Sequence, residues 1–475
     1  MSLPDGWEMV VGLEVHTELK TTTKMFCGCA NLFGAEPNTR VCAVCLGLPG
    51  SLPVLNVRAI ELAMAIGCAL HSTISPSTFH RKNYFYPDMP KDFQISQYDL
   101  PINVGGYVDL PDGSRVSVER AHLEEDTGKS THLGGSGRIH GAERSLVDYN
   151  RSGVPLVEIV SGPDIRSSAQ ARLYASELRG ILIATGASDG RMEEGSMRID
   201  ANVSVRHADE PFGTRCEIKN LNSLRSLGRA IDYEALRQIE LLNEGGVVRQ
   251  ETRHWDETLG ATSTMRTKEE AEDYRYFREP DLVDLAPDLA WQERVREGLG
   301  PMPGERRAVL AARLSEPSST QLDAVQVVVD LGFDALVTSA LDAHVEGALA
   351  LARAANELAA DAEHLQNLTT EAFVTTLLME QNGELSATQA KTVLLELLAH
   401  GGDPQAIAAA RGFEQLSADS LGDVVAALIE AHPEEWSRFR DGDEKLAQFF
   451  IGQVMKATKG QANGKAVIAE LHARR

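Results

Sequence analysis

The chain has 475 residues, of which 43% are hydrophobic and 24% are charged. These proportions are ordinary for a globular protein and exclude disorder throughout the chain. The formal net charge of -23 excludes a protein that coats nucleic acid nonspecifically, because phosphate contacts require a basic surface. The first residues lack the features of a signal peptide, and no run of about 18 apolar residues predicts a membrane helix. We therefore expect a cytoplasmic protein without a membrane partner.

The N-terminal part of the chain shows both strand and helix patterns. Period-two alternation predicts a strand at 9–19 whose polar face carries Glu14 and His16. A second alternating strand at 197–206 carries Asp200 on its polar face. The other predicted elements are, in chain order, a helix at 58–70, strands at 116–118 and 154–160, and helices at 168–185 and 224–242.

A Pro/Gly stretch at 298–304 separates this part from a region that is rich in Ala and Leu and shows no strand alternation. We therefore predict an α+β fold with three parts. These are a mixed α/β domain at 1–295, an all-α helical domain at 296–402 and a small α-helical tail domain at 403–475.

Four of the six cysteines lie close together in the sequence, as Cys27, Cys29, Cys42 and Cys45. Two close pairs of thiolates can complete a tetrahedral Zn²⁺ site. Four protein ligands leave no open position for water, so such a site would be structural rather than catalytic. The alternative is four ordinary buried thiols.

Ionisable side chains on the predicted strands are candidates for a catalytic site. Glu14, His16 and Asp200 also suit the solvated outer face of an antiparallel sheet. Glu158 interrupts an apolar run, and a buried charge requires a cation or a hydrogen-bond donor nearby. The acids at 124–126 suit either a solvated turn or Mg²⁺, which prefers oxygen ligands.

The segment at 79–91 (FHRKNYFYPDMPK) combines basic and aromatic side chains. Such a segment can bind the phosphates and stack on a base of a single-stranded nucleic-acid end, although it also suits a loop anchored in the core. Gly128-Lys129-Ser130 is not a phosphate-binding loop, because Leu123 stands where that motif requires a glycine.

Several long strings resemble one family. They are VGLEVH at 11–16, RKNYFYP at 81–87, HLEEDTGKSTH at 122–132, NRSGVPLVEIVS at 150–161, MEEGSMRIDAN at 192–202, EIKNLNS at 217–223 and GQVMKATKGQAN at 452–463. In this order they resemble the B subunits of the glutamyl/aspartyl-tRNA amidotransferases. The resemblance implies a cradle-shaped catalytic domain, a helical domain and a YqeY-like tail domain that binds tRNA.

The resemblance also implies an enzyme that works as a heterotrimer. Its A subunit is an amidase that releases ammonia from glutamine, and a small C subunit holds the other two together. Its B subunit uses ATP and Mg²⁺ to phosphorylate the side-chain carboxylate of mischarged Glu-tRNA(Gln) or Asp-tRNA(Asn). Ammonia then displaces phosphate. The missing glycine-rich loop leaves the ATP site unassigned.

Individual residues acquire expected roles from the same resemblance. The expected Mg²⁺ site consists of His16, Glu125, Glu158, Glu14 and Asp200. Lys91 and Glu125 are expected to form a gate on the ammonia route, and Lys91, Glu125 and Glu158 to act in catalysis. The expected contacts with aminoacyl-tRNA are Arg81, Lys82 and Tyr84 in the catalytic domain and Lys456 and Lys459 in the basic tail.

Two other classes of protein remain as alternatives. A binding module would only deliver tRNA while a partner performs the chemistry, but Glu158 and the polar face with Glu14 and His16 argue against it. A zinc hydrolase would need an open metal position, which four cysteine ligands do not leave.

Overall fold

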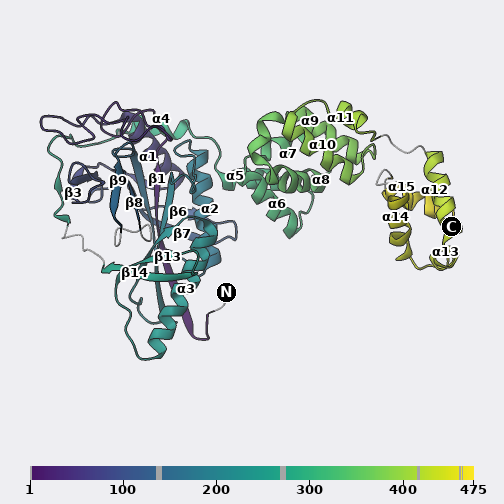
Figure 1. Ribbon diagram of the computed structural model, residues 1–475, viewed down its shortest axis with the longest axis horizontal. Coiled ribbons are helices and arrows are strands. Elements are labelled where there is room, and N and C mark those ends of the chain that lie inside the picture. Colours follow the sequence, from purple (N-terminus) through teal and green to yellow (C-terminus); the bar gives the residue numbers. More distant parts are fainter. Residues whose placement is uncertain (1–2, 135–141, 268–273, 414–417, 459–461, 463) are drawn as a thin grey trace. The chain divides into compact units, whose positions relative to one another are not determined.

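The computed structural model describes residues 3–134, 142–267, 274–413, 418–458, 462 and 464–475. The chain divides into two compact units, Met1–Gly304 and Glu305–Arg475, each considered by itself (Figure 1). Unit 1 contains a large sheet with helices, and the described residues of unit 2 form helices without strands. The predicted α+β class is therefore confirmed.

The described residues of unit 1 form a 13-stranded sheet, and β8 and β9 form a separate pair. The main path of the sheet runs β14-β13-β12-β11-β1-β10-β7-β4-β3-β15, with β2, β5 and β6 paired beside it. The strands are β1 (Trp7–Glu18), β2 (Thr73–Ile74), β3 (His80–Asn83), β4 (Phe93–Ser96), β5 (Asn103–Val104), β6 (Tyr107–Asp109), β7 (Arg115–Glu125), β8 (Lys129–Leu133), β9 (Arg144–Asp148), β10 (Pro155–Ser161), β11 (Met197–His207), β12 (Cys216–Leu221), β13 (Glu251–Asp256), β14 (Ala261–Thr267) and β15 (Phe277–Arg278).

β1 lies between β10 and β11 and is antiparallel to both. Val11, Leu13 and Val15 are fully buried on one face of β1. Glu14 and His16 lie on the opposite face, because side chains alternate along a strand. Burial of each large apolar side chain contributes about 1.5–3 kcal/mol, so the alternation decides which face of the sheet meets the core.

Three helices pack on the apolar face of the sheet, namely α1 (Val57–Ala69), α2 (Ser168–Ala184) and α3 (Leu224–Asn243) (Figure 1). Each begins after a residue whose side chain accepts a hydrogen bond from a backbone N–H of the first turn. These N-cap residues are Asn56, Ser167 and Ser223. A fourth helix, α4 (Leu289–Glu297), contacts α1. These helices leave the polar face of the same strands available for a functional site.

The strands and helices predicted for this unit are present, with ends that differ by one or two residues. The exception is the predicted strand at 116–118, which is the start of the longer β7. In the second half of β7, one face carries only polar side chains. The other face carries two apolar side chains and then Glu125. All five residues at 121–125 are buried. The alternation of apolar and polar residues therefore does not reveal where β7 ends.

The described residues of unit 2 are helical. Its elements are α5 (Pro303–Ala312, which begins at the end of unit 1), α6 (Ser319–Asp330), α7 (Asp334–Asp342), α8 (Gly347–Arg353), the π-helical turn η2 (Ala354–Leu358), the 3₁₀ helix η3 (Ala362–Asn367), α9 (Thr370–Gln381), α10 (Ala387–His400), α11 (Pro404–Ala410), α12 (Ala418–Ala431), α13 (Pro433–Arg440), α14 (Leu446–Ala457) and α15 (Gly464–Ala473).

Apolar side chains of unit 2 form two separate cores, one around Phe373 and Leu394 and another around Phe439 and Phe450. The domain limits predicted at 295 and 402 stay predictions. Among the described residues, every helix is too short or too polar to cross a membrane.

Candidate active site

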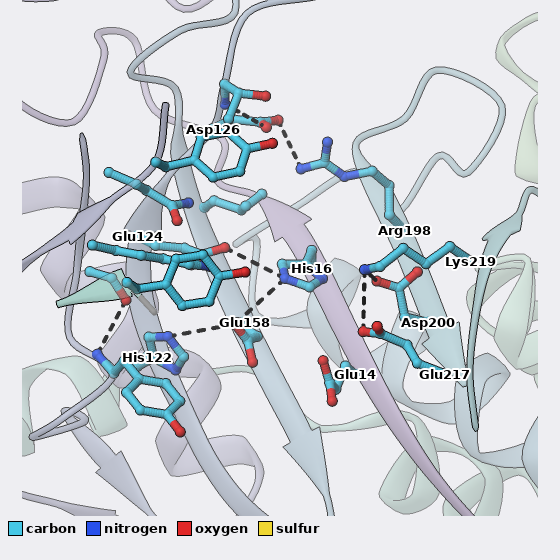
Figure 2. A pocket seen from close by; sticks show the side chains of 18 of the residues that line it. Glu14, His16, His122, Glu124, Asp126, Glu158, Arg198, Asp200, Glu217 and Lys219 are labelled. Carbon is cyan, nitrogen blue, oxygen red and sulfur yellow. Dashed lines mark hydrogen bonds and ion pairs between the residues drawn. The ribbon is translucent and has the colours of Figure 1, made fainter. Parts of the chain in front are cut away.

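A cavity of about 720 Å³ lies over the polar face of the sheet in unit 1 (Figure 2). Its acidic lining residues are Glu14, Glu124, Asp126, Glu158, Asp200 and Glu217. Its lysines and arginines are Lys82, Arg120, Arg198, Arg215 and Lys219. Such a concentration of both charges in one concave site is typical of an active site for a charged substrate.

Strand register brings side chains into this cavity from distant parts of the chain. His16 of β1 lies opposite Glu158 of β10 on one side and opposite Arg198 of β11 on the other. Glu158 in turn lies opposite His122 of β7. Residues that lie opposite one another on antiparallel strands point to the same face. The sheet therefore aligns these four side chains in a row across its polar face.

His16, Glu124 and Glu158 form a compact group of candidate metal ligands. The Nε2 atom of His16 lies 3.6 Å from a carboxylate oxygen of Glu124 and 3.6 Å from one of Glu158. Ligand atoms of the three residues all lie within 4.8 Å of one another. Two carboxylates favour hard cations such as Mg²⁺ or Mn²⁺, and three protein ligands leave positions for substrate oxygens. This group therefore fits a catalytic divalent cation.

The electrostatics of the group are strongly perturbed. Burial lowers the pKa of His16, but the hydrogen bond and charge of Glu158, with the charge of Glu124, raise it to about 9. Burial and the charge of Glu158 raise the pKa of Glu124 to about 7. Burial also opposes ionisation of Glu158, yet the charges of His122 and His16 hold its pKa well below its usual range. The group therefore holds protons that a divalent cation can displace.

A second acidic group adjoins the first. Asp200 and Glu14, both predicted for the site, line the same cavity, and Asp200 lies opposite Glu14 in the sheet. The Nζ atom of Lys219 lies 2.6 Å from Asp200 and 3.3 Å from Glu217. Asn202 donates a hydrogen bond of 2.8 Å to Glu14. Glu217 and Lys219 were not predicted as site residues, although period two in EIKNLNS places both on one strand face.

Glu125 lies on the side of β7 that faces away from the cavity. Successive side chains of a strand point to opposite faces, so Glu124 faces the cavity and its neighbour Glu125 does not. The expected Mg²⁺ site of His16, Glu125, Glu158, Glu14 and Asp200 therefore requires a correction at Glu125. Glu124 occupies the place that was expected for Glu125.

The side chain of Glu125 forms an ion pair with Lys91. The backbone N–H of Ile95 donates a hydrogen bond of 2.9 Å to the same carboxylate. The side chains of Lys91 and Glu125 are only 7% and 2% exposed. The structure thus contains the expected Lys91–Glu125 pair, and its role as a gate stays a prediction.

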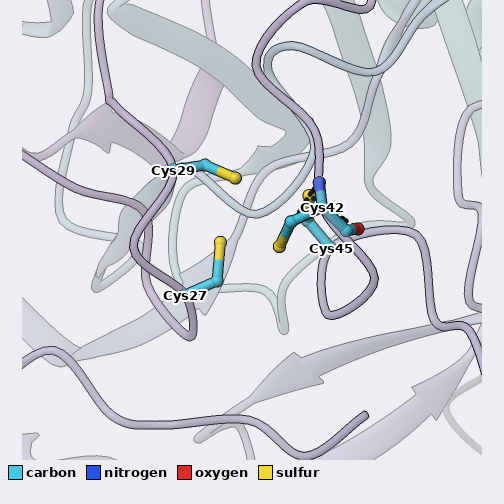
Figure 3. Close-up of side chains that lie close together, drawn as sticks. All are labelled: Cys27, Cys29, Cys42 and Cys45. Carbon is cyan, nitrogen blue, oxygen red and sulfur yellow. Dashed lines mark hydrogen bonds between the residues drawn. The ribbon is translucent and has the colours of Figure 1, made fainter.

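The four clustered cysteines come together at one place in unit 1 (Figure 3). Their Sγ atoms lie within 4.8 Å of one another, and those of Cys42 and Cys45 are 3.8 Å apart. A hydrogen bond from Cys27 lowers the pKa of Cys45 to about 5. Burial raises the pKa of Cys29 to about 11. Four sulfur atoms at this spacing fit a tetrahedral Zn²⁺ site without an open position.

The loop that follows Cys45 packs directly on Lys91. Gly47 in this loop has a φ of +66°, and an added Cβ would lie 2.6 Å from Cγ of Lys91. A Cβ on Gly153 would lie 3.7 Å from Cβ of Cys45 and 3.7 Å from a carboxylate oxygen of Glu125. The cysteine group therefore borders the Lys91–Glu125 pair.

Two of the three residues expected to bind aminoacyl-tRNA in the catalytic domain reach the cavity. Lys82 and Tyr84 line it, and Nζ of Lys82 lies 4.6 Å from the ring centre of Tyr274. Arg81 does not line the cavity. Its guanidinium donates two hydrogen bonds of 2.6 and 2.8 Å to Glu279. Arg81 thereby ties β3 to the segment around Glu279, and its contact with tRNA stays a prediction.

The tail residues expected to bind tRNA belong to unit 2. Lys456 is exposed in the last turn of α14. Lys459 lies outside the described residues. Contact of either residue with tRNA stays a prediction.

These features define unit 1 as an α+β domain with a polar cavity whose residues fit a divalent cation. Residues 9–293 match the GatB/GatE catalytic domain, and residues 333–474 match the GatB domain. The chain therefore belongs to the GatB family, as its motifs predict.

Three proteins that are similar to this chain are each described as the B subunit of an aspartyl/glutamyl-tRNA(Asn/Gln) amidotransferase. The protein of Frankia casuarinae is 49% identical, over 97% of this chain and 94% of the relative. The protein of Moorella thermoacetica is 46% identical, over 96% of this chain and 97% of the relative. The protein of Mycobacterium bovis is 47% identical, over 97% of this chain and 93% of the relative.

Proposed function

We propose that this chain, as the B subunit of a tRNA-dependent amidotransferase, activates the side-chain carboxylate of Glu-tRNA(Gln) or Asp-tRNA(Asn) with ATP and Mg²⁺. Membership of the GatB family and the description shared by its relatives support this assignment. The observation that carries the proposed chemistry is the group of His16, Glu124 and Glu158 in a cavity with many charged side chains.

Activation is needed because a free carboxylate would have to expel oxide when ammonia attacks. Transfer of the γ-phosphoryl group of ATP to a carboxylate oxygen breaks the bond to the β-phosphate, releases ADP and gives an acyl phosphate. Ammonia then attacks the carbonyl carbon and phosphate leaves with the electrons of the C–O bond. The nitrogen gives up one proton to solvent and the amide remains.

The acids of the cavity suit this reaction only if positive charge is also present. His16, Glu124 and Glu158 would hold Mg²⁺, which supplies the charge that offsets repulsion between ATP and the substrate carboxylate. Arg120, whose guanidinium lies 3.9 Å from Glu158, and Lys82 add positive charge beside this group. His16 must lose its proton before it can bind a cation through Nε2.

We further propose that ammonia from the amidase, the A subunit of a heterotrimer held together by a small C subunit, passes the Lys91–Glu125 pair. Glu125 adjoins Glu124 in the chain, and the two side chains lie on opposite faces of β7, so the proposed gate and the proposed cation group share this strand. Zn²⁺ held by the four cysteines would keep the loop with Gly47 against Lys91 and would have a structural role. We place this activity in the cytoplasm, together with translation.

The test is amide formation by the purified heterotrimer with each mischarged tRNA, ATP and Mg²⁺. Glutamine and ammonium salt serve as alternative nitrogen sources. We expect ATP-dependent product with both sources and none after removal of Mg²⁺. Glu158→Gln should abolish activation while tRNA binding persists. The matched control is Glu293→Gln, which changes an exposed acid on α4 and should leave activity unchanged.

Two outcomes would favour the alternative classes of protein. If Glu158→Gln kept full activation, the chain would only deliver tRNA and a partner would perform the chemistry. If activity survived thorough Mg²⁺ depletion but followed zinc content in Cys45→Ser, a zinc enzyme would be indicated. Zinc measured by atomic spectroscopy in the same preparations separates these outcomes.

A further inference from the structure

His122 is a buried histidine of β7 that the proposed chemistry does not use. The residue is 0% exposed, although it belongs to the lining of the large cavity. In the sheet it lies opposite Glu158 of β10, so both side chains point to the polar face (Figure 2). Nε2 of His122 lies 3.7 Å from Oε2 of Glu158. The ring therefore contacts a proposed ligand of the cation.

Neither ring nitrogen of His122 forms a hydrogen bond with the residues that the structure describes. A buried polar atom without a hydrogen-bond partner is unfavourable. A carboxylate only accepts, so Nε2 must carry the hydrogen whenever it bonds to Glu158. A shift of about 0.5–1 Å would turn the present contact into a hydrogen bond. Glu158 is therefore a partner within easy reach.

Oε2 of Glu158 lies between two histidines. Nε2 of His16 is 3.6 Å from this oxygen, and the other oxygen of Glu158 lies 3.9 Å from the guanidinium of Arg120. A histidine that binds a cation through Nε2 can no longer donate a hydrogen bond from that atom. If His16 is a cation ligand, His122 is the histidine that remains to hold Oε2 of Glu158.

His122 is not placed to bind the cation itself. Both of its nitrogen atoms are closed to solvent, and the ring of Tyr98 lies edge-on to it with 6.3 Å between ring centres. Carboxylates that bind metals are commonly oriented by hydrogen-bond donors behind them, and loss of such a donor typically weakens metal affinity about 10–100-fold. An imidazole N–H can donate without a formal charge, which would repel a cation.

We propose that His122 is a positioning residue, which holds Glu158 through a hydrogen bond from Nε2 when Glu158 binds the cation. This inference rests on the proposed function, because it concerns the same cation group. It accounts for a buried ring without hydrogen bonds at the position opposite Glu158. His122 acts through Glu158, so its substitution should change cation affinity and leave tRNA binding unchanged.

The first test measures Mn²⁺ binding to the heterotrimer by electron paramagnetic resonance. The amide nitrogen of His122→Gln can take the place of Nε2, whereas His122→Asn is one methylene shorter and cannot reach Glu158. Both variants lose the ring. We expect His122→Asn to weaken Mn²⁺ affinity about 10–100-fold and His122→Gln to recover most of that loss. The matched control is His364→Asn, which removes a histidine beside Asp361 in unit 2 and should leave the affinity unchanged.

Three results of this test would overturn the inference. Equal weakening by His122→Gln and His122→Asn would assign the effect to lost packing of the ring. Wild-type affinity in His122→Asn would remove His122 from the cation group. Spin-echo signals of a coordinated imidazole nitrogen that disappear in His122→Gln would make His122 a ligand. If His122→Asn does not fold, His122→Phe keeps a buried ring without a donor, and the same weakening is expected.

The second test follows single-turnover amide formation as the Mg²⁺ concentration is varied. His122→Asn should raise the concentration for half-maximal activity about 10–100-fold, while the rate at saturating Mg²⁺ approaches that of the wild type. A lower saturating rate with an unchanged Mg²⁺ midpoint would indicate a general structural defect and would count against positioning of Glu158.

The inference and the proposed function fail in distinguishable ways. If Glu158→Gln weakened Mn²⁺ binding and amide formation but His122→Asn weakened neither, the positioning role would be wrong and the proposed function would stand. If Glu158→Gln left both Mn²⁺ affinity and amide formation unchanged, the proposed function itself would be wrong.

Discussion

Glu124 and Glu125 are adjacent in β7, yet they belong to two regions with different electrostatics. Glu124 lies in the large cavity with His16 and Glu158, where several carboxylates share one space. Glu125 lies on the other face of the strand, buried in an ion pair with Lys91 beside the four cysteines. One peptide bond separates an open region with many charges from a closed region in which the charges are paired.

The difference shows how one strand can carry a proposed cation ligand on one face and a buried ion pair, the proposed ammonia gate, on the other. In the cavity, burial together with neighbouring carboxylates raises the pKa of Glu124 to about 7, so removal of its charge disturbs the fold little. At the Lys91–Glu125 pair, loss of one partner leaves the other charge buried without compensation. We therefore expect changes in the cavity to affect catalysis and changes at the pair to affect stability.

The largest effect is expected when the buried pair is broken. Lys91→Met leaves the carboxylate of Glu125 without its cation, which should lower the free energy of unfolding of unit 1 by about 3–5 kcal/mol. Hydrogen exchange of the β7 and β10 amides measures this for unit 1 alone.

Two controls sharpen that measurement. Addition of Glu125→Gln to Lys91→Met removes both charges and should recover most of the loss. Arg115→Met breaks an exposed ion pair with Asp109, which solvent screens, and should cost much less than the change at Lys91. Equal losses at Lys91 and Arg115 would mean that the Lys91–Glu125 pair does not lie in a closed region.

The next effect distinguishes the two adjacent glutamates in catalysis. Glu124→Gln should lower ATP-dependent activation about 10²–10³-fold, because it removes a proposed ligand of the cation that stabilises the transferring charge. Glu125→Gln should retain activation when ammonium salt supplies the nitrogen. The measurement is single-turnover amide formation with saturating ammonium. Loss of activity in Glu125→Gln alone would support Glu125 as the metal ligand.

The third prediction concerns pH in the absence of divalent cations. The pKa of His16 is raised from 6.5 to about 9 in the folded chain. Below pH 6.5 His16 is protonated in both the folded and the unfolded chain, so its full stabilisation is present. Between pH 6.5 and 9 only the folded chain keeps the proton, and a stabilisation of up to about 3 kcal/mol is lost.

Unfolding measured in EDTA at several pH values tests this prediction. The stability difference between the wild-type chain and His16→Gln should shrink as pH rises through about 9. A constant difference would show that His16 is neutral in the folded protein.

The smallest effect is expected outside both regions. Lys456→Ala removes one exposed cation of α14 and should weaken tRNA binding about threefold, with a decrease of about one in the slope of affinity against salt. The matched control is Lys391→Ala, which removes an exposed lysine of α10. An unchanged salt slope in Lys456→Ala would remove this residue from the tRNA contact.

The sequence was sufficient to predict those parts of the site that follow from a single strand or from short spacing. Period two placed Glu14 and His16 on one face of β1. The apolar run around Glu158 predicted a cation or a hydrogen-bond donor nearby, and the structure places His16 there. The four cysteines were predicted from spacing, because a tetrahedral site needs ligands that are close in the chain or in space.

Other parts of the site depend on long-range pairing that one strand does not reveal. Which of Glu124 and Glu125 faces the cavity depends on how β7 pairs with β10. Because both faces of β7 carry buried polar residues there, the sequence alone does not show which face each side chain occupies. Arg81 is bound by Glu279, which lies 198 residues away in the chain.

The double pairing of β1 has a consequence for errors in folding. A slip of one residue would turn Val11, Leu13 and Val15 toward solvent and would bury charged groups in their place. Each exposed side chain would forfeit about 1.5–3 kcal/mol, so the slipped sheet would be too unstable to persist. A chain that has formed its core has therefore also aligned His16 with Glu158. Correct alignment of the polar site during folding is therefore enforced by apolar residues on the opposite face of the strand.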